Sequence, residues 1–186
     1  MRFDKRFGPT ALILVVLLPF YFGCTHNATF EKRGCFPTVC FTPGGDCTSI
    51  IVGEIEKAKK RILVQAYSFT SVPIADALVD AFHRGVKVEV ILDKSQKGQR
   101  ASMIDLLVDT GIPTYIDTQH SIAHNKIMVI DRTTVITGSF NFTKAAQEKN
   151  AENLIFLHAP ALISRYTKNW MGHREHSQQI AVSGRL

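Results

Sequence analysis

Apolar and polar positions follow two alternating periods through the middle of the chain. A helical period from 47 to about 60, which Asp46 or Thr48 can cap, precedes the buried-strand run ILVQAYS at 62–68. The alternation continues with a helix at 73–84, a strand at 87–93, a helix at 102–110 and a short strand at 114–116. Such βα repetition predicts parallel strands in a sheet that helices cover on both faces.

The pattern then changes to one without intervening long helices. The expected elements are a hairpin of strands 126–130 and 134–137, a strand at 153–158 and a last helix from Pro160 to about Gly172. Neither a repeat nor a linker interrupts 47–172, so this segment is predicted to form one α/β domain. The expected architecture is an α/β/α sandwich with a mixed, largely parallel sheet. Residues 173–186 are expected to form a basic tail.

The first part of the chain has the pattern of an export segment. Three basic residues, Arg2, Lys5 and Arg6, precede an apolar run at 11–22. Residues 1–23 are therefore predicted to be a signal peptide or an N-terminal membrane anchor, because the uncharged stretch approaches the ~17–20 residues that span a bilayer. The pair Gly23-Cys24 also fits a lipoprotein signal. In each case the folded body is exported, to the periplasm or the outside, with or without a membrane anchor.

All the cysteines lie near the start of the chain, in or beside an extension at 24–46. They are Cys24, Cys35, Cys40 and Cys47. An oxidising compartment permits disulfides, and four cysteines allow three pairings, which the sequence leaves open. Their spacing lacks the C-x2-C pattern of a structural zinc site, so disulfides are favoured over zinc.

Composition narrows the class of protein more than its function. The 186 residues are 45% hydrophobic and 20% charged, as in an ordinary globular domain and unlike a disordered, collagenous or polytopic membrane protein. A chain of this length buries about 70% of its unfolded surface, so its core requires neither metal nor disulfide. The formal charge of +6 favours anionic partners only mildly.

Residues suited to phosphate chemistry gather between 123 and 156. His124 and Lys126 stand two apart at the start of a strand, so both side chains point to one face. A neutral imidazole can attack phosphorus while a neighbouring ammonium neutralises a phosphate oxygen. Ser139 and Asn141 repeat this spacing and offer a hydroxyl and an amide to the same oxygens. Glu152 can orient an imidazole through its second nitrogen.

The H-x-K-x4-D spacing that begins at His124, followed by G-S-x-N at 138–141, resembles the phospholipase D superfamily. More closely, the chain resembles the small bacterial secreted endonucleases that carry this motif once. The likeness covers about residues 38–172 and includes the segments VCFTPGGDCTSII, ILVQAYSFTS, AHNKIMVID, GSFNFT and KNAEN. The resemblance implies a phospholipase D-like fold and a phosphodiesterase activity.

The resemblance also implies roles for individual residues. It makes His124 the nucleophile that forms a phosphohistidine. The phosphate would be held by Lys126, Ser139 and Asn141. Glu152 would be the hydrogen-bond partner of a catalytic imidazole, and Asp131 a motif residue that positions its neighbours. Neither a metal nor another cofactor is implied, because Lys126 and the hydrogen-bond donors neutralise the phosphate.

Stoichiometry predicts more than one copy of the chain. Double displacement needs one neutral histidine to attack and a second, protonated one to donate to the leaving oxygen. The H-x-K motif occurs only once, at 124–126. A second His124 must then come from another chain, so the expected assembly is a C2 homodimer with a composite active site.

The motif itself leaves the substrate open, because its chemistry acts on the phosphate alone. The single motif, the small size, the basic charge and the endonuclease-like segments favour nonspecific hydrolysis of DNA or RNA. The predicted membrane segment favours the alternative, a phospholipase D acting on phosphatidylcholine-type lipids, although no insertion is large enough to form an acyl-chain channel. A non-catalytic nucleic-acid-binding module is a second alternative, which the intact site residues argue against.

The remaining histidines have simpler interpretations. His120 lies four residues before His124, but this segment is typical of a loop that enters a strand, so an exposed loop histidine is expected rather than a metal ligand. His83, His173 and His176 lie near helix ends, where the helix dipole accounts for them.

Overall fold

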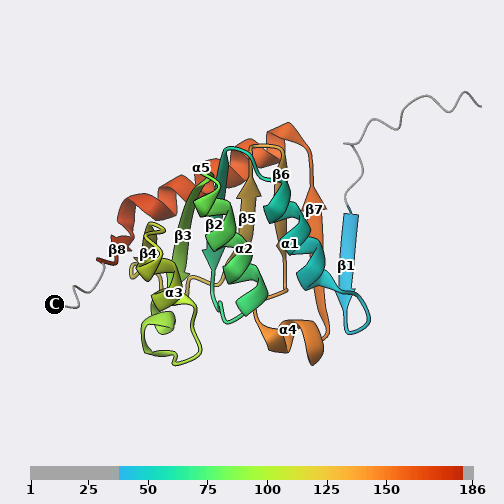
Figure 1. Cartoon of the computed structure of the whole chain (residues 1–186), viewed down its shortest axis with the longest axis horizontal. Helices are drawn as coiled ribbons and strands as arrows, with labels where there is room; N and C mark the ends of the chain where they lie inside the picture. Colours follow the sequence, from blue (N-terminus) through green and yellow to red (C-terminus); the bar gives the residue numbers. More distant parts are fainter. Residues whose placement is uncertain (1–37, 182–186) are drawn as a thin grey trace, which may run out of the picture. The chain divides into compact units, whose positions relative to one another are not determined.

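The structure, a computed structural model, describes residues 38–181 and arranges them around an eight-stranded sheet (Figure 1). The order of the strands is β1-β7-β6-β5-β2-β3-β4-β8. The strands are β1 Thr38–Thr42, β2 Arg61–Ala66, β3 Lys87–Asp93, β4 Thr114–Asp117, β5 Lys126–Ile130, β6 Thr134–Gly138, β7 Glu152–Leu157 and β8 Gln178–Gln179. The helices are α1 Cys47–Lys57, α2 Val72–His83, α3 Ile104–Asp109, α4 Lys144–Glu148 and α5 Pro160–His176, with a 3₁₀ helix η1 at Lys94–Gly98.

Parallel pairing is confined to β2, β3 and β4, and the other neighbouring strands pair antiparallel. Helices α2 and α3 connect the parallel strands, whereas residues 131–133 turn β5 directly back into β6. Such a tight connection joins only antiparallel strands. The predicted mixed sheet is confirmed, but its parallel share is smaller than expected, because β5, β6 and β7 turn back on one another.

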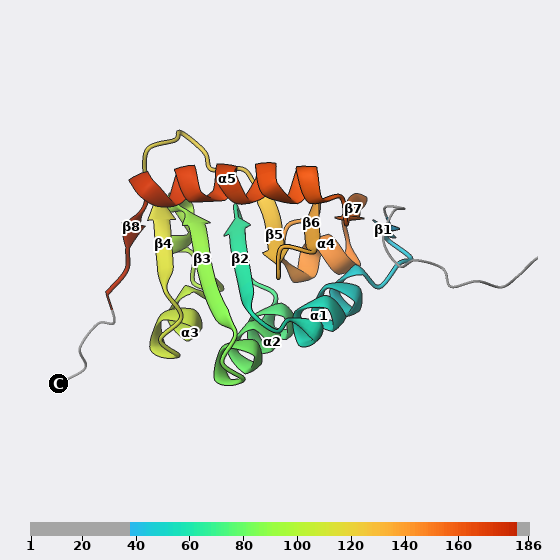
Figure 2. The same ribbon diagram turned by 90° about the horizontal axis from the view of Figure 1, so that it is seen from above.

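Helices cover both faces of the sheet, as the sequence predicts. Helices α1, α2 and α3 lie on one face, and α5 crosses the other (Figure 2). The larger core includes Ile55 of α1 and Leu78 of α2, and a smaller core forms beneath Ile163 and Trp170 of α5. The indole nitrogen of Trp170 also donates to the Val64 carbonyl at 2.8 Å, which fixes α5 on the sheet. Burying each such side chain contributes about 1.5–3 kcal/mol.

Local signals set the helix ends. The Asp46 carboxylate caps α1 by accepting a hydrogen bond from the Ser49 amide at 3.1 Å. Pro73 lies in the first turn of α2, and Gly85, with a φ of +86°, follows the end of that helix. The helices and strands expected within 47–172 are all present, with somewhat different ends.

Several elements were not expected from the sequence, and one of them is the 3₁₀ helix η1. Strand β1 pairs with β7 and strand β8 with β4, so residues assigned to an N-terminal extension and a C-terminal tail belong to the sheet. Helix α4 was not anticipated, and α5 continues past Gly172 to His176. A disulfide joins Cys40 of β1 to Cys47 of α1, which selects one of the bonds that the sequence left open.

Other predictions about the N-terminal part concern residues outside the described range. These are the export segment at 1–23 and the states of Cys24 and Cys35. Among residues 38–181, no helix combines the length and the apolar character needed to cross a membrane.

Candidate active site

The antiparallel strands bring the segments with candidate catalytic residues to one edge of the sheet, namely the edge formed by the carboxyl end of β2 and the adjoining strand ends. Lys126 at the start of β5 pairs with Ala66 at the end of β2, and Gly138 at the end of β6 pairs with Leu154 near the start of β7. Residues just before β5, just after β6 and at the start of β7 therefore meet at the same edge. This edge collects His124, Lys126, Ser139, Asn141 and Glu152.

An aromatic side chain directly after β2 supports the start of the H-x-K motif. The Tyr67 ring packs against the exposed His124 imidazole, with 4.6 Å between the ring centroids. The Lys126 Nζ lies 5.0 Å from the centroid of the same ring and donates to the His124 carbonyl at 2.8 Å. The sequence analysis did not identify Tyr67 as a site residue. Its position directly after the β2 strand, at the edge where β5 begins, was the signal that could have shown it.

The Lys126 ammonium is held in a poorly solvated position. The residue is only 5% exposed. Burial lowers the pKa of Lys126, and the negative charge of Glu152 opposes that shift without cancelling it, so the pKa lies below its ordinary value. A bound phosphate would supply the counter-charge that such an ammonium lacks.

Ser139 and Glu152 form a hydrogen-bonded pair between the end of β6 and the start of β7. The Ser139 hydroxyl donates to one Glu152 oxygen at 2.6 Å, and the Asn150 amide donates to the other at 2.9 Å. Ser139 Oγ in turn accepts from the Asn153 backbone amide at 3.0 Å. These bonds fix the direction of the hydroxyl and place a carboxylate beside it.

Gly138 allows this close approach of β6 to β7. Its φ is +152°, and a Cβ at this position would collide with the Asn153 carbonyl oxygen. That same carbonyl accepts hydrogen bonds from the amides of Ser139, at 3.0 Å, and Phe140, at 3.2 Å. The glycine of the G-S-x-N segment therefore sets the path on which Ser139 and Asn141 stand.

Asn141 carries an unsatisfied polar atom. Its Oδ1 is buried and finds no hydrogen-bond partner among the described residues. The flanking Phe140 and Phe142 are fully buried, so the backbone around Asn141 is held firmly. An amide oxygen and nitrogen exchange places by a simple flip, so this side chain can turn an N–H toward a phosphate oxygen.

Asp131 does not lie beside the other residues of the H-x-K-x4-D motif. It lies at the far end of β5, roughly 17 Å along an extended strand from Lys126. Its carboxylate accepts hydrogen bonds from the backbone amides of Lys59, Lys60 and Arg61 at 2.6, 2.7 and 2.8 Å. Burial alone would raise the pKa of Asp131, but these amides outweigh it and the pKa lies below its ordinary value. Its role is to fasten the end of β5 to the start of β2, in line with the positioning role that the resemblance implied.

The predicted contact between Glu152 and an imidazole is not present within the single described chain. Both carboxylate oxygens bind Ser139 and Asn150 instead. His124 lies in the loop between β4 and β5, where it packs on Tyr67.

Comparison with known proteins identifies the family. Residues 51–173 match the family model described as cardiolipin synthase, PLD-like domain. The chain belongs to the phospholipase D superfamily. The H-x-K motif and the G-S-x-N segment, on which the resemblance to this family rests, lie together at one edge of the sheet.

Individual relatives agree with this membership. The chain is 44% identical over 137 residues to a protein named phospholipase D from Rickettsia typhi. The matched segment covers 74% of this chain and 67% of the relative. It is 30% identical over 170 residues to the mitochondrial cardiolipin hydrolase of Xenopus laevis, covering 91% of this chain and 79% of that one. Among solved structures, the chain is similar to Nuc from Salmonella typhimurium, a phospholipase D family member, with 35% identity and a TM-score of 0.74. The match covers 78% of this chain and 98% of the Nuc chain.

This member of the phospholipase D superfamily is a phosphoric diester hydrolase. The described edge contains the parts that such a reaction needs: an exposed imidazole, a buried ammonium, a fixed hydroxyl and an amide with an unsatisfied atom. Together they can hold the oxygens of a phosphodiester while a nitrogen attacks phosphorus.

Proposed function

We propose that this phosphodiesterase is a metal-independent, nonspecific endonuclease that hydrolyses DNA or RNA through a phosphohistidine at His124. The observation that carries the proposal is the exposed His124 ring beside the buried Lys126 ammonium at an open edge of the sheet. Lys126 takes the place of a metal ion in neutralising the phosphate.

Surroundings of the site support a nucleic acid over a lipid. A neighbouring pocket of about 480 Å³ is lined by Tyr67 together with small and polar residues: Ser68, Ser95, Gln96, Gly98 and Gln99. Hydroxyl and amide groups suit a sugar-phosphate backbone, whereas acyl chains need an apolar channel. The positive charge of the chain also favours a polyanion.

The proposed reaction proceeds in two displacements. The neutral His124 nitrogen attacks phosphorus, a P–N bond forms, and the bond from phosphorus to the leaving oxygen breaks as a second, protonated imidazole gives that oxygen its proton. The second imidazole then takes a proton from water, which attacks phosphorus and breaks the P–N bond. Lys126, Ser139 and Asn141 hold the phosphate oxygens throughout. We propose that the second imidazole is His124 of another copy of the chain, in a C2 homodimer, and that Glu152 orients it.

We also propose that the body is exported, by the segment at 1–23. The disulfide between Cys40 and Cys47 supports this, because disulfides persist in oxidising compartments such as the periplasm.

The test compares the full wild-type chain with its His124→Ala variant on plasmid DNA, single-stranded RNA and phosphatidylcholine vesicles, all in EDTA. We expect cleavage of the nucleic acids and intact lipid with the wild type, and a loss of about 10⁴-fold or more in the variant. A His83→Ala variant, altered at an exposed histidine of α2, serves as the control and should remain fully active. Activity that needs added Mg²⁺ would contradict the proposed mechanism.

One specific observation favours a second candidate, a phospholipase D. Several relatives from Rickettsia bear that name, and the predicted membrane segment would keep the site near lipid. Release of the head group from the vesicles with intact DNA and RNA would establish this alternative. Binding of DNA without cleavage of any of the three substrates would instead support a non-catalytic module.

A further inference from the structure

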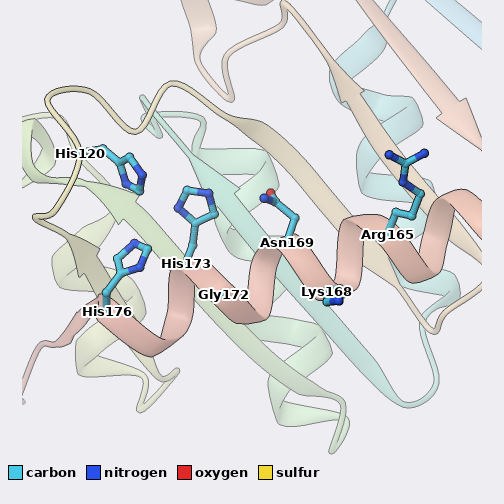
Figure 3. Close-up of a pocket in the computed structure, with 7 residues that line it drawn as sticks. All are labelled: His120, Arg165, Lys168, Asn169, Gly172, His173 and His176. Atoms are coloured by element: carbon cyan, nitrogen blue, oxygen red, sulfur yellow. The ribbon is translucent and has the colours of Figure 1, made fainter.

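A second group of chemically capable side chains lies at the β4 end of the sheet. Asp117, fully buried at the end of β4, is surrounded by three imidazoles. Its Oδ2 lies 2.8 Å from His173 Nδ1, 3.0 Å from His120 Nδ1 and 3.3 Å from His176 Nε2. Figure 3 shows His173 and His176 projecting from the last turns of α5 toward His120, which comes from the loop between β4 and β5.

The four donor atoms lie close enough together for a shared metal ion, and the three distances to the Asp117 oxygen are those of a tetrahedral site. They all lie within 4.8 Å of one another. Bonds of 2.0–2.1 Å to zinc place neighbouring donors about 3.3 Å apart, and the oxygen-to-nitrogen distances around Asp117 are 2.8–3.3 Å. The spacing of His173 and His176, three residues apart on a helix, places both on the same side of α5. Small rotations of the rings would therefore bring the donors to a common ion.

We propose that Asp117, His120, His173 and His176 form a binding site for one zinc ion. Three imidazole nitrogens and one carboxylate oxygen suit a borderline metal such as Zn²⁺ far better than Mg²⁺ or Ca²⁺, which prefer oxygen ligands. The protein supplies all four positions of a tetrahedron, so the site is closed and structural, with no position left for a reacting water.

The site is separate from the phosphate-binding edge around Lys126. Strands β2 and β3 lie between β4 and β5 in the sheet, so the two sites are about 14 Å apart at the usual strand spacing. The inference therefore holds whether the enzyme hydrolyses nucleic acid or lipid. It differs from the sequence-based expectation that His120, His173 and His176 are ordinary loop and helix-end residues.

Zinc here would hold the segment that carries the proposed nucleophile. The loop from 118 to 125 directly follows Asp117. It contains both His120 and His124, which lie four residues apart. Other bonds already hold this loop: Lys94 Nζ donates to the His120 carbonyl at 3.0 Å, and the Ala123 amide donates to an Asp93 oxygen at 2.7 Å. A metal bound to His120 would add a link from this loop to both β4 and the end of α5.

The direct test measures metal binding by the full chain without a histidine tag. The protein is stripped with EDTA and dialysed, and any free thiol at Cys24 or Cys35 is alkylated so that sulfur cannot bind metal. Calorimetric titration with Zn²⁺ should then show one ion per chain, and Mg²⁺ or Ca²⁺ should show none. Co²⁺ in place of Zn²⁺ should give the visible absorption of a tetrahedral nitrogen and oxygen site, without a sulfur charge-transfer band.

Variants locate the site and decide the proposal. His173→Ala should weaken zinc binding by about 100-fold or more, since even the loss of a supporting residue around a ligand costs 10–100-fold. His120→Asn should do the same, and His120 has a side chain 44% exposed in a loop, so this change leaves folding intact. His83→Ala is the matched control and should bind zinc like the wild type.

Two results would overturn the proposal. One is the absence of zinc binding by the wild type when circular dichroism shows it folded. The other is unchanged zinc affinity in folded His120→Asn. The pocket beside the cluster, about 440 Å³, is also lined by Arg165 and Lys168. Binding of inorganic phosphate there without any zinc binding would show an anion site in place of a metal site.

Discussion

At the scale of single residues, His124 and Lys126 lie close together but in different environments. The His124 ring is exposed and rests on Tyr67, which suits a group that must reach a substrate. The Lys126 ammonium is buried, and burial lowers its pKa despite the nearby charge of Glu152. A buried charge costs folding free energy unless it is well paired. Under the proposed mechanism, Lys126 thus serves function rather than stability.

Replacing Lys126 with Met should separate these two effects. We expect the variant to gain about 1 kcal/mol in the free energy of unfolding, because an incompletely paired charge leaves the interior. Hydrolysis should fall by about 10³-fold, because the cation that stabilises the phosphate is lost. Lys144→Met, which changes an exposed lysine of α4, should alter neither quantity. Urea unfolding and initial rates measure the two effects, and a Lys126→Met protein less stable than the wild type would disagree with this account.

Tyr67 is expected to act as a positioning residue for His124. Tyr67→Phe keeps the ring and should keep the activity, whereas Tyr67→Ala leaves the imidazole without its support. We expect kcat to fall by about 10- to 100-fold in the alanine variant, with a smaller change in KM. Steady-state kinetics of the two variants provide the measurement. Equal kcat values would show that the contact between the rings does not orient His124.

At the scale of elements, Asp131 links the end of β5 to the start of β2. The three amides that it binds belong to the segment leading into β2. The sequence places this residue in the H-x-K-x4-D motif, but spacing alone does not tell at which end of a strand a side chain acts. In the structure Lys126 lies at one end of β5, where the proposed chemistry takes place. Asp131 follows the other end and holds the strand in position.

Asp131→Asn should destabilise the fold without removing the nucleophile. Loss of a charge-assisted set of hydrogen bonds should cost about 3 kcal/mol at pH 7. Because the folded pKa of Asp131 lies below the unfolded value, its contribution is present above the unfolded pKa of about 3.9 and disappears as the pH falls through the folded pKa. The difference between wild type and variant in urea unfolding should therefore shrink toward low pH. Asp80→Asn, at an exposed position of α2, is the control, and a pH-independent difference would contradict the assignment.

Much of the element order could be predicted because the segments between 47 and 172 have clear periods. Strand β5 begins and ends where the pattern placed it, since the continuous apolar run 127–130 follows Lys126 and precedes Asp131. Strand β8 was missed because two residues are too short to show a period. Strand β1 was missed because it lies at the end of the strand order and is defined by its pairing with β7, which is far away in the sequence; long-range pairing with β4 likewise stabilises β8. The same reason hid the cluster around Asp117. His120 and His173 are far apart in the chain, and only the docking of α5 against β4 brings them together.

At the scale of the whole molecule, the proposed mechanism needs two copies of the chain. One chain provides one H-x-K motif, and in the described chain Glu152 binds Ser139 and Asn150 rather than an imidazole. Two copies related by a twofold axis would bring two His124 side chains to one phosphate. Sedimentation equilibrium of an active sample should therefore show a dimer, and an active monomer would contradict the composite site.

Mixing wild type with His124→Ala tests the shared site kinetically. After subunit exchange at equal amounts, about a quarter of the pairs contain two wild-type chains. If both imidazoles are required, the activity per total protein should fall to about a quarter of the wild-type value, whereas independent monomers would retain about half. A result near one half after demonstrated exchange would show that each chain works alone.

The central claim is that His124 becomes covalently phosphorylated during turnover. The most direct measurement is rapid alkaline quenching of the enzyme with a short oligonucleotide, followed by mass spectrometry of the peptide that contains His124. We expect a phosphate-linked adduct on this histidine in the wild type and none in His124→Ala. Efficient cleavage with His124 unmodified at every time point, or an adduct on a different residue, would contradict the account.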